Sequence, residues 1–246
     1  MRLSVCIPAY QAERYVRETI DSVLADVPDD AEIVLVDDGS DDGTHEVAAS
    51  YRPRVRALRQ VHGGIGAAFN TAVAASSGDV IAAIDADDVW ISGRTEAQLD
   101  RLAAEPRVDA VFGHVREFLS PDVPTEMRAR WVYREAPVPG ILRGAMMIHR
   151  SAWERVGAMD TDLQIGEFIA WYARAVDAGV KMFVLPHVVL ARRIHGNNTV
   201  LTAQEPHRDY LQVVRAVLER RRGGRGDRDV HGSGQGAAGV ATSPGG

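Results

Sequence analysis

The sequence contains a single cysteine, Cys6, among its 246 residues, so no disulfide can form within the chain. Cys6 lies in an apolar run over residues 3–7, where a buried, unreactive thiol is expected. Pro8 ends this run, which is too short for a secretory leader. No other apolar stretch has the length of a membrane-spanning helix. These absences predict a cytoplasmic protein without a membrane span.

An excess of basic residues is also absent. The chain has 28 Lys and Arg against 34 Asp and Glu, for a formal net charge of −6. Such a balance does not favour nucleic acid as a partner. Apolar residues make up 46% and charged residues 25%, which is ordinary for a globular domain of this length. None of these features predicts an oligomeric state.

Short apolar runs alternate with amphipathic segments over the first hundred residues. Strands are predicted over residues 3–7, 33–36, 55–61 and 80–84, and helices over 12–25, 44–50 and 67–75. This alternation favours an α/β domain with a mainly parallel, doubly wound sheet flanked by helices. Ligands in such domains bind at the carboxyl ends of the strands.

The second half of the chain is less regular. Strands are predicted over residues 108–118, 180–185 and 188–194, and helices over 151–157, 166–178 and 205–222. Four prolines between residues 120 and 139 indicate a loop-rich segment that shapes a pocket. Residues 223–246 are Gly-rich without apolar periodicity, which predicts a disordered tail. We therefore predict one domain over residues 1–222, with halves at 1–105 and 106–222.

Two acidic clusters directly follow predicted strands. Asp85, Asp87 and Asp88 fall within four positions, and a divalent cation such as Mg²⁺ or Mn²⁺ would relieve their mutual repulsion. Asp37 and Asp38 precede a Gly-Ser pair, and a carboxylate there could accept hydrogen bonds from a nucleotide base or ribose. Each cluster also has a plainer interpretation, as an acidic helix cap for the first and an Asp-Gly turn for the second.

A glycine-rich stretch, Gly63 to Gly66, precedes the third predicted helix. Backbone N–H groups at a helix start could bind an anion, but small residues there could equally serve close helix–strand packing. The stretch matches neither the dinucleotide-binding glycine pattern nor a P-loop with its lysine, so both of those interpretations are weak.

Four motifs, taken in order, resemble those of the inverting family 2 glycosyltransferases, which have the GT-A fold. They are Val5-Cys6-Ile7-Pro8-Ala9-Tyr10, Val36-Asp37-Asp38-Gly39-Ser40, Gly66-Ala67-Ala68-Phe69-Asn70 and Ile84-Asp85-Ala86-Asp87-Asp88-Val89-Trp90. The resemblance is strong over residues 1–100 and looser to about residue 200. It implies transfer of a sugar from a nucleotide-diphosphate sugar, with UDP-sugar favoured, to an unidentified acceptor hydroxyl. It also implies inversion and a divalent cation, Mn²⁺ or Mg²⁺.

The resemblance further implies roles for individual residues on the donor side. Pro8, Ala9 and Tyr10 would line the nucleoside pocket, Asp37 would bind the base, and Asp38 would lie near the ribose. Asp85, beside Ala86, would contact the ribose or the sugar, and Asp87 would coordinate the metal on the diphosphate. Gly66, Asn70 and Ala86 belong to the same donor-binding set.

The segment from Arg193 to Asn198 resembles the closing motif of the same family, an Arg-x-His-x-x-Asn pattern. In that role Arg193 would pair with a phosphate, and His195 would complete the metal shell or contact the diphosphate. An exposed arginine and a structural histidine are the plainer alternatives.

The acceptor half departs from the family pattern at one position. Family members carry Glu-Asp ahead of an aromatic-rich helix, with the Asp as general base, whereas here Phe168 follows Glu167. Glu167 is the nearest carboxylate that could take that role, and Asp160 and Asp162 are weaker candidates. Glu167 could instead only stabilise the helix start by its negative charge.

Two other functions are compatible with the sequence. A nucleotidyltransferase would also use carboxylates and a metal, but Pro8-Ala9-Tyr10-Gln11 stands where its Gly-rich basic loop is expected. A family member that binds a nucleotide sugar without turnover would account for Phe168 at the position of the base.

Overall fold

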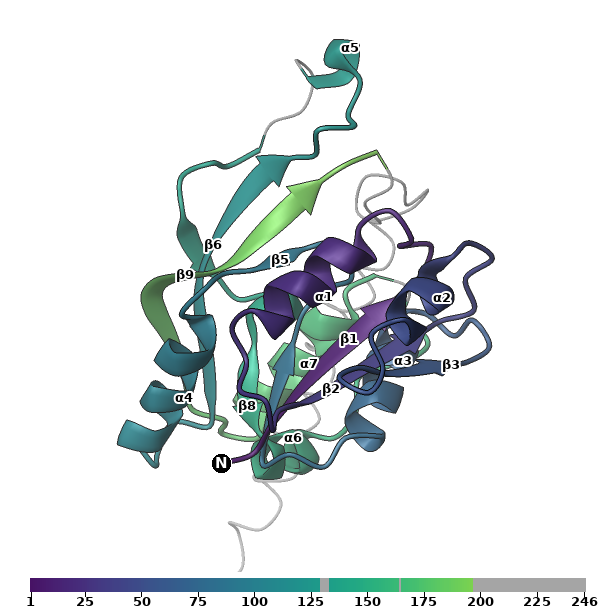
Figure 1. Ribbon diagram of the computed structural model, residues 1–246. Coiled ribbons are helices and arrows are strands. Elements are labelled where there is room, and N and C mark those ends of the chain that lie inside the picture. Colours follow the sequence, from purple (N-terminus) through teal and green to yellow (C-terminus); the bar gives the residue numbers. More distant parts are fainter. Residues whose placement is uncertain (129–132, 164, 197–246) are drawn as a thin grey trace, which may run out of the picture.

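The computed structural model describes residues 1–128, 133–163 and 165–196 (Figure 1). The predicted helix over 205–222, the predicted tail over 223–246 and Asn198 of the closing motif lie outside these residues. Within the described part, no helix is long and apolar enough to cross a membrane.

The first half of the chain folds as alternating strands and helices, and its strands pair in parallel. Strand β1 (Leu3–Ala9) lies between β2 (Glu32–Asp37) and β4 (Val80–Ala83), and β3 (Arg56–Arg59) pairs with the outer side of β2. The helices that follow the first three strands are α1 (Val16–Leu24), α2 (Thr44–Ala49) and α3 (Ile65–Ala74). The predicted alternation is therefore confirmed for this half.

The second half completes the sheet mostly through antiparallel pairs. The strand order is β3-β2-β1-β4-β8-β6-β9-β5, and β7 also pairs with β6. The strands of the second half are β6 (Ala110–Leu119), β7 (Val138–Gly140), β8 (Met147–His149) and β9 (Met182–Ile194), and β5 (Val89–Trp90) from the end of the first half pairs with β9. Only β6 and β9 are parallel among them, so the sheet is mixed.

The later strands of the sheet differ from the sequence prediction in two ways. The strands predicted over 180–185 and 188–194 form one strand, β9, whose pairing with β6 shifts register around His114. Strands β5, β7 and β8 were not predicted, because two or three residues are too few to show a strand pattern. The remaining helices are α4 (Arg94–Ala104), the short η1 (Arg143–Ala145), α5 (Thr125–Arg128), α6 (Arg150–Val156) and α7 (Glu167–Asp177).

An apolar core covers each face of the sheet. Side chains alternate along β1, so Val5 and Ile7 pack with α1, whereas Cys6 packs on the other face with α3. Trp153 of α6 and Trp171 of α7 belong to this second core. Figure 1 accordingly shows α1 in front of β1 and α7 behind it.

The two acidic clusters meet at the edge formed by the carboxyl ends of β1, β2 and β4. Ala9 at the end of β1 pairs with Asp37 at the end of β2, and Asp85 lies two residues after the end of β4. The hydroxyl of Thr19, on α1, donates to the carbonyls of Ala86 and Asp88 at 3.0 and 2.7 Å. Helix α1 therefore holds the second cluster beside the first.

Candidate functional site

Asp37 forms a tight turn at the end of β2. Its side chain is fully buried, and its Oδ1 accepts the backbone N–H of Ser40 at 3.1 Å. Its Oδ2 has no hydrogen-bond partner among the described residues and lies 3.3 Å from Nε of Arg59. Gly39 within the turn has φ +79°, and a Cβ there would lie 3.0 Å from the backbone nitrogen of His62. The turn therefore requires glycine at position 39. Within the described part of the chain, it leaves Oδ2 of Asp37 with only the charge of Arg59 as a partner.

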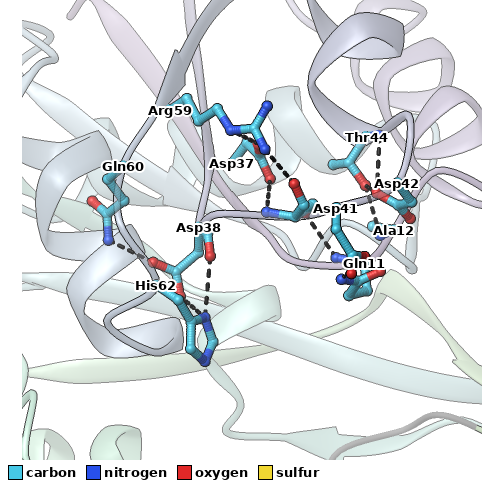
Figure 2. A network of polar contacts seen from close by, with 11 residues as sticks. Gln11, Ala12, Asp37, Asp38, Asp41, Asp42, Thr44, Arg59, Gln60 and His62 are labelled. Carbon is cyan, nitrogen blue, oxygen red and sulfur yellow. Dashed lines mark hydrogen bonds and ion pairs between the residues drawn. The ribbon is translucent and has the colours of Figure 1, made fainter.

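Asp38 organises the loop that leads into α3 (Figure 2). Its carboxylate accepts the backbone N–H groups of Gly63 and Gly64 at 3.0 and 2.8 Å, and the side-chain amide of Gln60 at 2.7 Å. Nδ1 of His62 lies 2.9 Å from its Oδ2. The N–H groups before α3 therefore already bind an anion, which is the carboxylate of Asp38. The geometry does not support a phosphate-binding role for the glycine-rich stretch.

Tyr10 offers a flat aromatic surface next to these two aspartates. Its side chain is 50% exposed, and its ring stacks on that of His62 with centroids 4.2 Å apart. Pro8 and Ala9 are buried within β1. Of the three residues predicted to line the nucleoside pocket, Tyr10 is therefore the one whose side chain reaches the surface, where a planar base could stack.

Asp85 and Asp87 have partly exposed carboxylates, with 32% and 29% of their side chains accessible. Oδ1 of Asp85 lies 2.5 Å from Nη2 of Arg143. Oδ2 of Asp87 lies 2.9 Å from Nε2 of His195. The two side chains therefore have separate partners, as expected for residues that alternate in direction.

Asp88 turns into the protein. It is buried, and its Oδ1 accepts the backbone N–H of Arg193 at 2.9 Å. Burial, and then the charges of Asp87 and Asp85, raise the pKa of Asp88 well above its ordinary value. The N-terminal N–H groups of α4 bond instead to Asp26, so the acidic turn does not cap that helix.

Arg193 secures the end of β9 to the second acidic cluster. Its Nε donates to the carbonyl of Asp87 at 2.8 Å, and its Nη2 contacts Glu18 at 2.5 Å. The guanidinium lies near the rings of Tyr15 and Phe118. Arg193 is therefore buried in contacts that place the segment leading to His195, and its predicted pairing with a phosphate remains a prediction.

Asp87 and His195 form a candidate metal-binding pair. No group of three or more metal-ligating side chains occurs in the described ranges. The pair supplies one carboxylate oxygen and one imidazole nitrogen, and Tyr15 packs on His195 with ring centroids 4.6 Å apart. This donor set suits an ion that takes one or two protein ligands and completes its shell with phosphate and water, as Mg²⁺ does. Mn²⁺ favours similar oxygen ligands.

A cavity of about 410 Å³ opens beside His195. Its lining is mostly polar and includes Gln11, Glu13, Arg14, Tyr15, Asp42, Asp122 and His195. Asp122 accepts the hydroxyl of Tyr15 at 2.7 Å and pairs with Arg14 at 2.8 Å. A ligand on the Asp87–His195 pair would therefore have open space next to it.

Glu167 is the first residue of α7 and is largely buried. Its Oε1 lies 2.6 Å from Nη1 of Arg143, the same residue that holds Asp85. Burial lowers the pKa of Arg143, but the charges of Asp85 and Glu167 outweigh it and raise the pKa above its ordinary value. Arg143 is not predicted from the sequence, because the stretch Ile141–Gly144 carries no motif. An arginine within an apolar run is the only signal it offers.

Phe168 belongs to the core. It is buried, and its ring lies 5.9 Å from Trp171 and 6.3 Å from both Phe112 and Tyr172. A core aromatic thus stands at the position where the family resemblance implies a catalytic Asp. The carboxylate of the neighbouring Glu167 turns toward Arg143.

Gly66 and Asn70 join α3 to the loop before α7. The side-chain amide of Asn70 makes two hydrogen bonds of 2.9 Å with the backbone of Met159. A Cβ at Gly66 would lie 2.9 Å from the carbonyl oxygen of Asp160 and 3.4 Å from Cγ of Glu167. Both residues pack the two halves together, and direct contact of either with a donor remains a prediction.

Comparison with known proteins identifies the family. The profile of glycosyl transferase family 2 matches residues 4–157. The chain belongs to glycosyl transferase family 2. An uncharacterized glycosyltransferase of Nostoc sp. is 43% identical over 94 residues, which cover 37% of this chain and 29% of the relative. One of Rickettsia prowazekii is 26% identical over 235 residues, which cover 89% of this chain and 72% of the relative.

The fold of this family 2 chain is similar to that of solved GT-A structures. Staphylococcus aureus TarS 1-349 in complex with UDP-GlcNAc superimposes with a TM-score of 0.71 at 19% identity. The match covers 88% of this chain and 65% of the 1-349 fragment, and a match to the longer structure of TarS covers 39% of that chain. The predicted GT-A fold is confirmed, and nothing supports the nucleotidyltransferase alternative.

Proposed function

We propose that the chain transfers a sugar from a UDP-sugar to an acceptor hydroxyl with inversion, in a reaction that requires a divalent cation. The observation that carries this proposal is the 2.9 Å approach of Asp87 and His195, which are 108 residues apart in the sequence. Family membership and the UDP-GlcNAc complex of TarS support the choice of donor.

The nucleoside part of the donor would lie over Tyr10 and against Asp37. An ionised carboxylate is only an acceptor, so Oδ2 of Asp37 matches a base that presents an N–H at the facing ring position, as uracil does. The Arg59 side chain, 47% exposed, lies next to this oxygen. Its displacement would admit the base, which favours UDP over CDP, because cytosine has no N–H at that ring nitrogen.

The diphosphate would lie at Asp87 and His195, beside the open cavity. A divalent cation bound there neutralises the leaving diphosphate. Asp87 would contribute the carboxylate ligand, and His195 would bind the cation or a phosphate oxygen. Tyr15 and Arg193 keep the two side chains in place.

Glu167 would act as the general base. Its Oε1 is bound to Arg143, and its Oε2 has no hydrogen-bond partner in the described part of the chain. That second oxygen can accept the proton of an acceptor hydroxyl as the hydroxyl attacks the anomeric carbon. Because Arg143 separates Glu167 from Asp85, the base lies apart from the diphosphate, as attack opposite the leaving group requires. This geometry favours a catalyst over a family member that only binds its donor.

The test is UDP binding by titration calorimetry, with Mn²⁺ and with EDTA. We expect Asp87→Asn to weaken UDP binding in Mn²⁺ by about 10- to 100-fold and to change binding in EDTA little. Asp41→Asn is the matched control, because Asp41 is an exposed carboxylate at the same edge, and its side chain accepts a hydrogen bond from Gln11. Equal affinities of wild type and Asp87→Asn in Mn²⁺ would contradict the proposed metal site.

A further inference from the structure

Arg143 contacts two carboxylates of the proposed site, Asp85 on the donor side and Glu167 on the acceptor side. We propose that Arg143 is a positioning residue, which holds the donor-side Asp85 and the base Glu167 at a fixed separation across the site. The inference rests on the proposed function, since it assigns Arg143 a task only if Glu167 takes the proton.

The two contacts use different nitrogens of one guanidinium. Nη1 lies 2.6 Å from Oε1 of Glu167, and Nη2 lies 2.5 Å from Oδ1 of Asp85. Only 5% of the Arg143 side chain is exposed, against 10% for Glu167 and 32% for Asp85. The guanidinium is planar and its donors are rigidly spaced, so it sets the distance and the relative orientation of the two carboxylates.

The backbone around Arg143 is itself held in the core. Arg94, fully buried on α4, donates to the carbonyl of Gly144 at 2.9 Å. The N–H of Met146 closes the short helix by donating to the carbonyl of Arg143 at 2.9 Å. These two hydrogen bonds fix the backbone that carries the Arg143 side chain. Because both carboxylates bind its guanidinium, their positions depend on this part of the fold.

This arrangement decides which oxygen of Glu167 meets the acceptor. Oε1 is bonded to Arg143, which leaves Oε2 for the acceptor proton. Without Arg143 the Glu167 side chain could rotate, and the carboxylate of Asp85 would lose the ion pair that it makes with Arg143. A displacement of about 1 Å in a reacting group costs about 10²-fold in rate, so the effect should be kinetic.

Hydrolysis of UDP-GlcNAc provides an assay that needs no known acceptor. Water replaces the acceptor hydroxyl: its oxygen bonds to the anomeric carbon, the bond from that carbon to the diphosphate oxygen breaks, and the proton goes to Glu167. We expect Arg143→Met to lower kcat for UDP release by about 10²-fold, with UDP affinity changed by less than about 3-fold. Arg143→Lys should be intermediate, since a lysine is a point charge that can hold one carboxylate at a time.

Arg150→Met controls for loss of stability. Arg150 is also partly buried and bonds to the carbonyl of Gly78 at 2.6 Å and to Oγ of Ser76 at 2.8 Å, near the amino end of β4. Its loss should lower the melting temperature while UDP release at a temperature where the variant is folded stays at the wild-type rate. An equal fall in kcat for Arg150→Met would show that the Arg143 effect is only a loss of stability, and would overturn the inference.

A double-mutant cycle with Glu167→Gln decides whether Arg143 acts through the base. We expect Arg143→Met to cost little further turnover once Glu167→Gln is present, because residues that act as a unit are not additive. Additive losses would overturn the inference. The same cycle on the melting temperature needs no catalysis, and an absence of coupling there would also overturn it. If wild type binds UDP but releases none from UDP-GlcNAc or other UDP-sugars, the proposed function fails. Coupling in the melting cycle would then show that Arg143 and Glu167 form a structural ion pair, and the kinetic role of Arg143 would be overturned with the function.

Discussion

The two aspartate pairs at the carboxyl edge of the sheet look alike in the sequence and differ in the structure. Asp37 and Asp38 are 0% and 1% exposed. Their carboxylates accept hydrogen bonds from backbone N–H groups of the turn and loop that follow them in the sequence. Asp85 and Asp87 keep about a third of each side chain exposed, and their partners are side chains of the second half. The first pair is mainly part of the scaffold, and the second pair is available to a ligand.

The difference follows from where each partner comes from in the chain. Backbone N–H groups within 26 residues bind Asp38, and an ionised carboxylate that accepts several N–H groups stabilises a loop strongly. The partners of Asp85 and Asp87 are 58 and 108 residues away. A site built from such distant residues can change its contacts when a ligand binds, without unfolding a turn.

The largest effect should come from removing the centre of the first pair. Asp38→Ala leaves the N–H groups of Gly63 and Gly64 without their acceptor, so we expect the free energy of unfolding to fall by about 3 kcal/mol. Urea unfolding measures this loss, and the exposed Asp41→Ala should cost less than about 0.5 kcal/mol. If Asp38→Ala kept its stability but bound UDP weakly, Asp38 would be the ribose contact that the family resemblance implies, and the contrast between the pairs would be wrong.

Glu167→Gln should lower turnover without a comparable loss of stability. The amide keeps the size of the side chain and loses the basic oxygen, so we expect UDP release to fall by about 10²-fold or more while UDP affinity stays nearly constant. Asp160→Asn serves as the matched variant, because Asp160 is an exposed carboxylate in the loop before α7. Wild-type turnover in Glu167→Gln, with loss in Asp160→Asn or Asp162→Asn, would place the base on that loop instead.

Cys6 lies on β1, between β2 and β4, and its reactivity should show the smallest change. Burial raises the pKa of its thiol from 9.0 to about 12, so the folded chain should resist thiol reagents at pH 8 because the thiolate is the reactive form. We expect Asp87→Asn to leave the labelling rate unchanged and Asp38→Ala to increase it through more frequent opening. Rapid labelling of the wild-type protein would contradict the burial of the Cys6 thiol.

The same thiol adds a small pH dependence to stability. The unfolded chain loses the Cys6 proton above about pH 9, whereas the folded chain keeps it until about pH 12. The unfolded state therefore binds fewer protons in that interval, and the thiol's contribution to stability declines as pH rises from 9 toward 12. Urea unfolding of wild type and Cys6→Ser at both ends of this interval measures the contribution as a difference, and an equal pH dependence in the two proteins would contradict it.

Local sequence patterns predict the first four strands, the helices between them and the positions of the two acidic clusters. Apolar runs in β1, β2 and β4 are continuous because helices cover both faces of the sheet, and Asp37 and Asp85 follow those runs directly. Such signals are local, since a strand and the turn after it are neighbours in the chain. The order of the family motifs could therefore be read without any structure.

The contacts that these residues make depend on segments that meet only in the folded chain. Arg143 comes from a short helix without a motif, yet pairing of β8 with β4 brings it to Asp85. Asp38, Asn70 and Arg193 were predicted to bind the donor, and the structure engages each of them in contacts with distant backbone or side-chain groups. Which carboxylates are bonded internally and which stay accessible depends on contacts between segments far apart in the chain, and sequence pattern does not encode those directly.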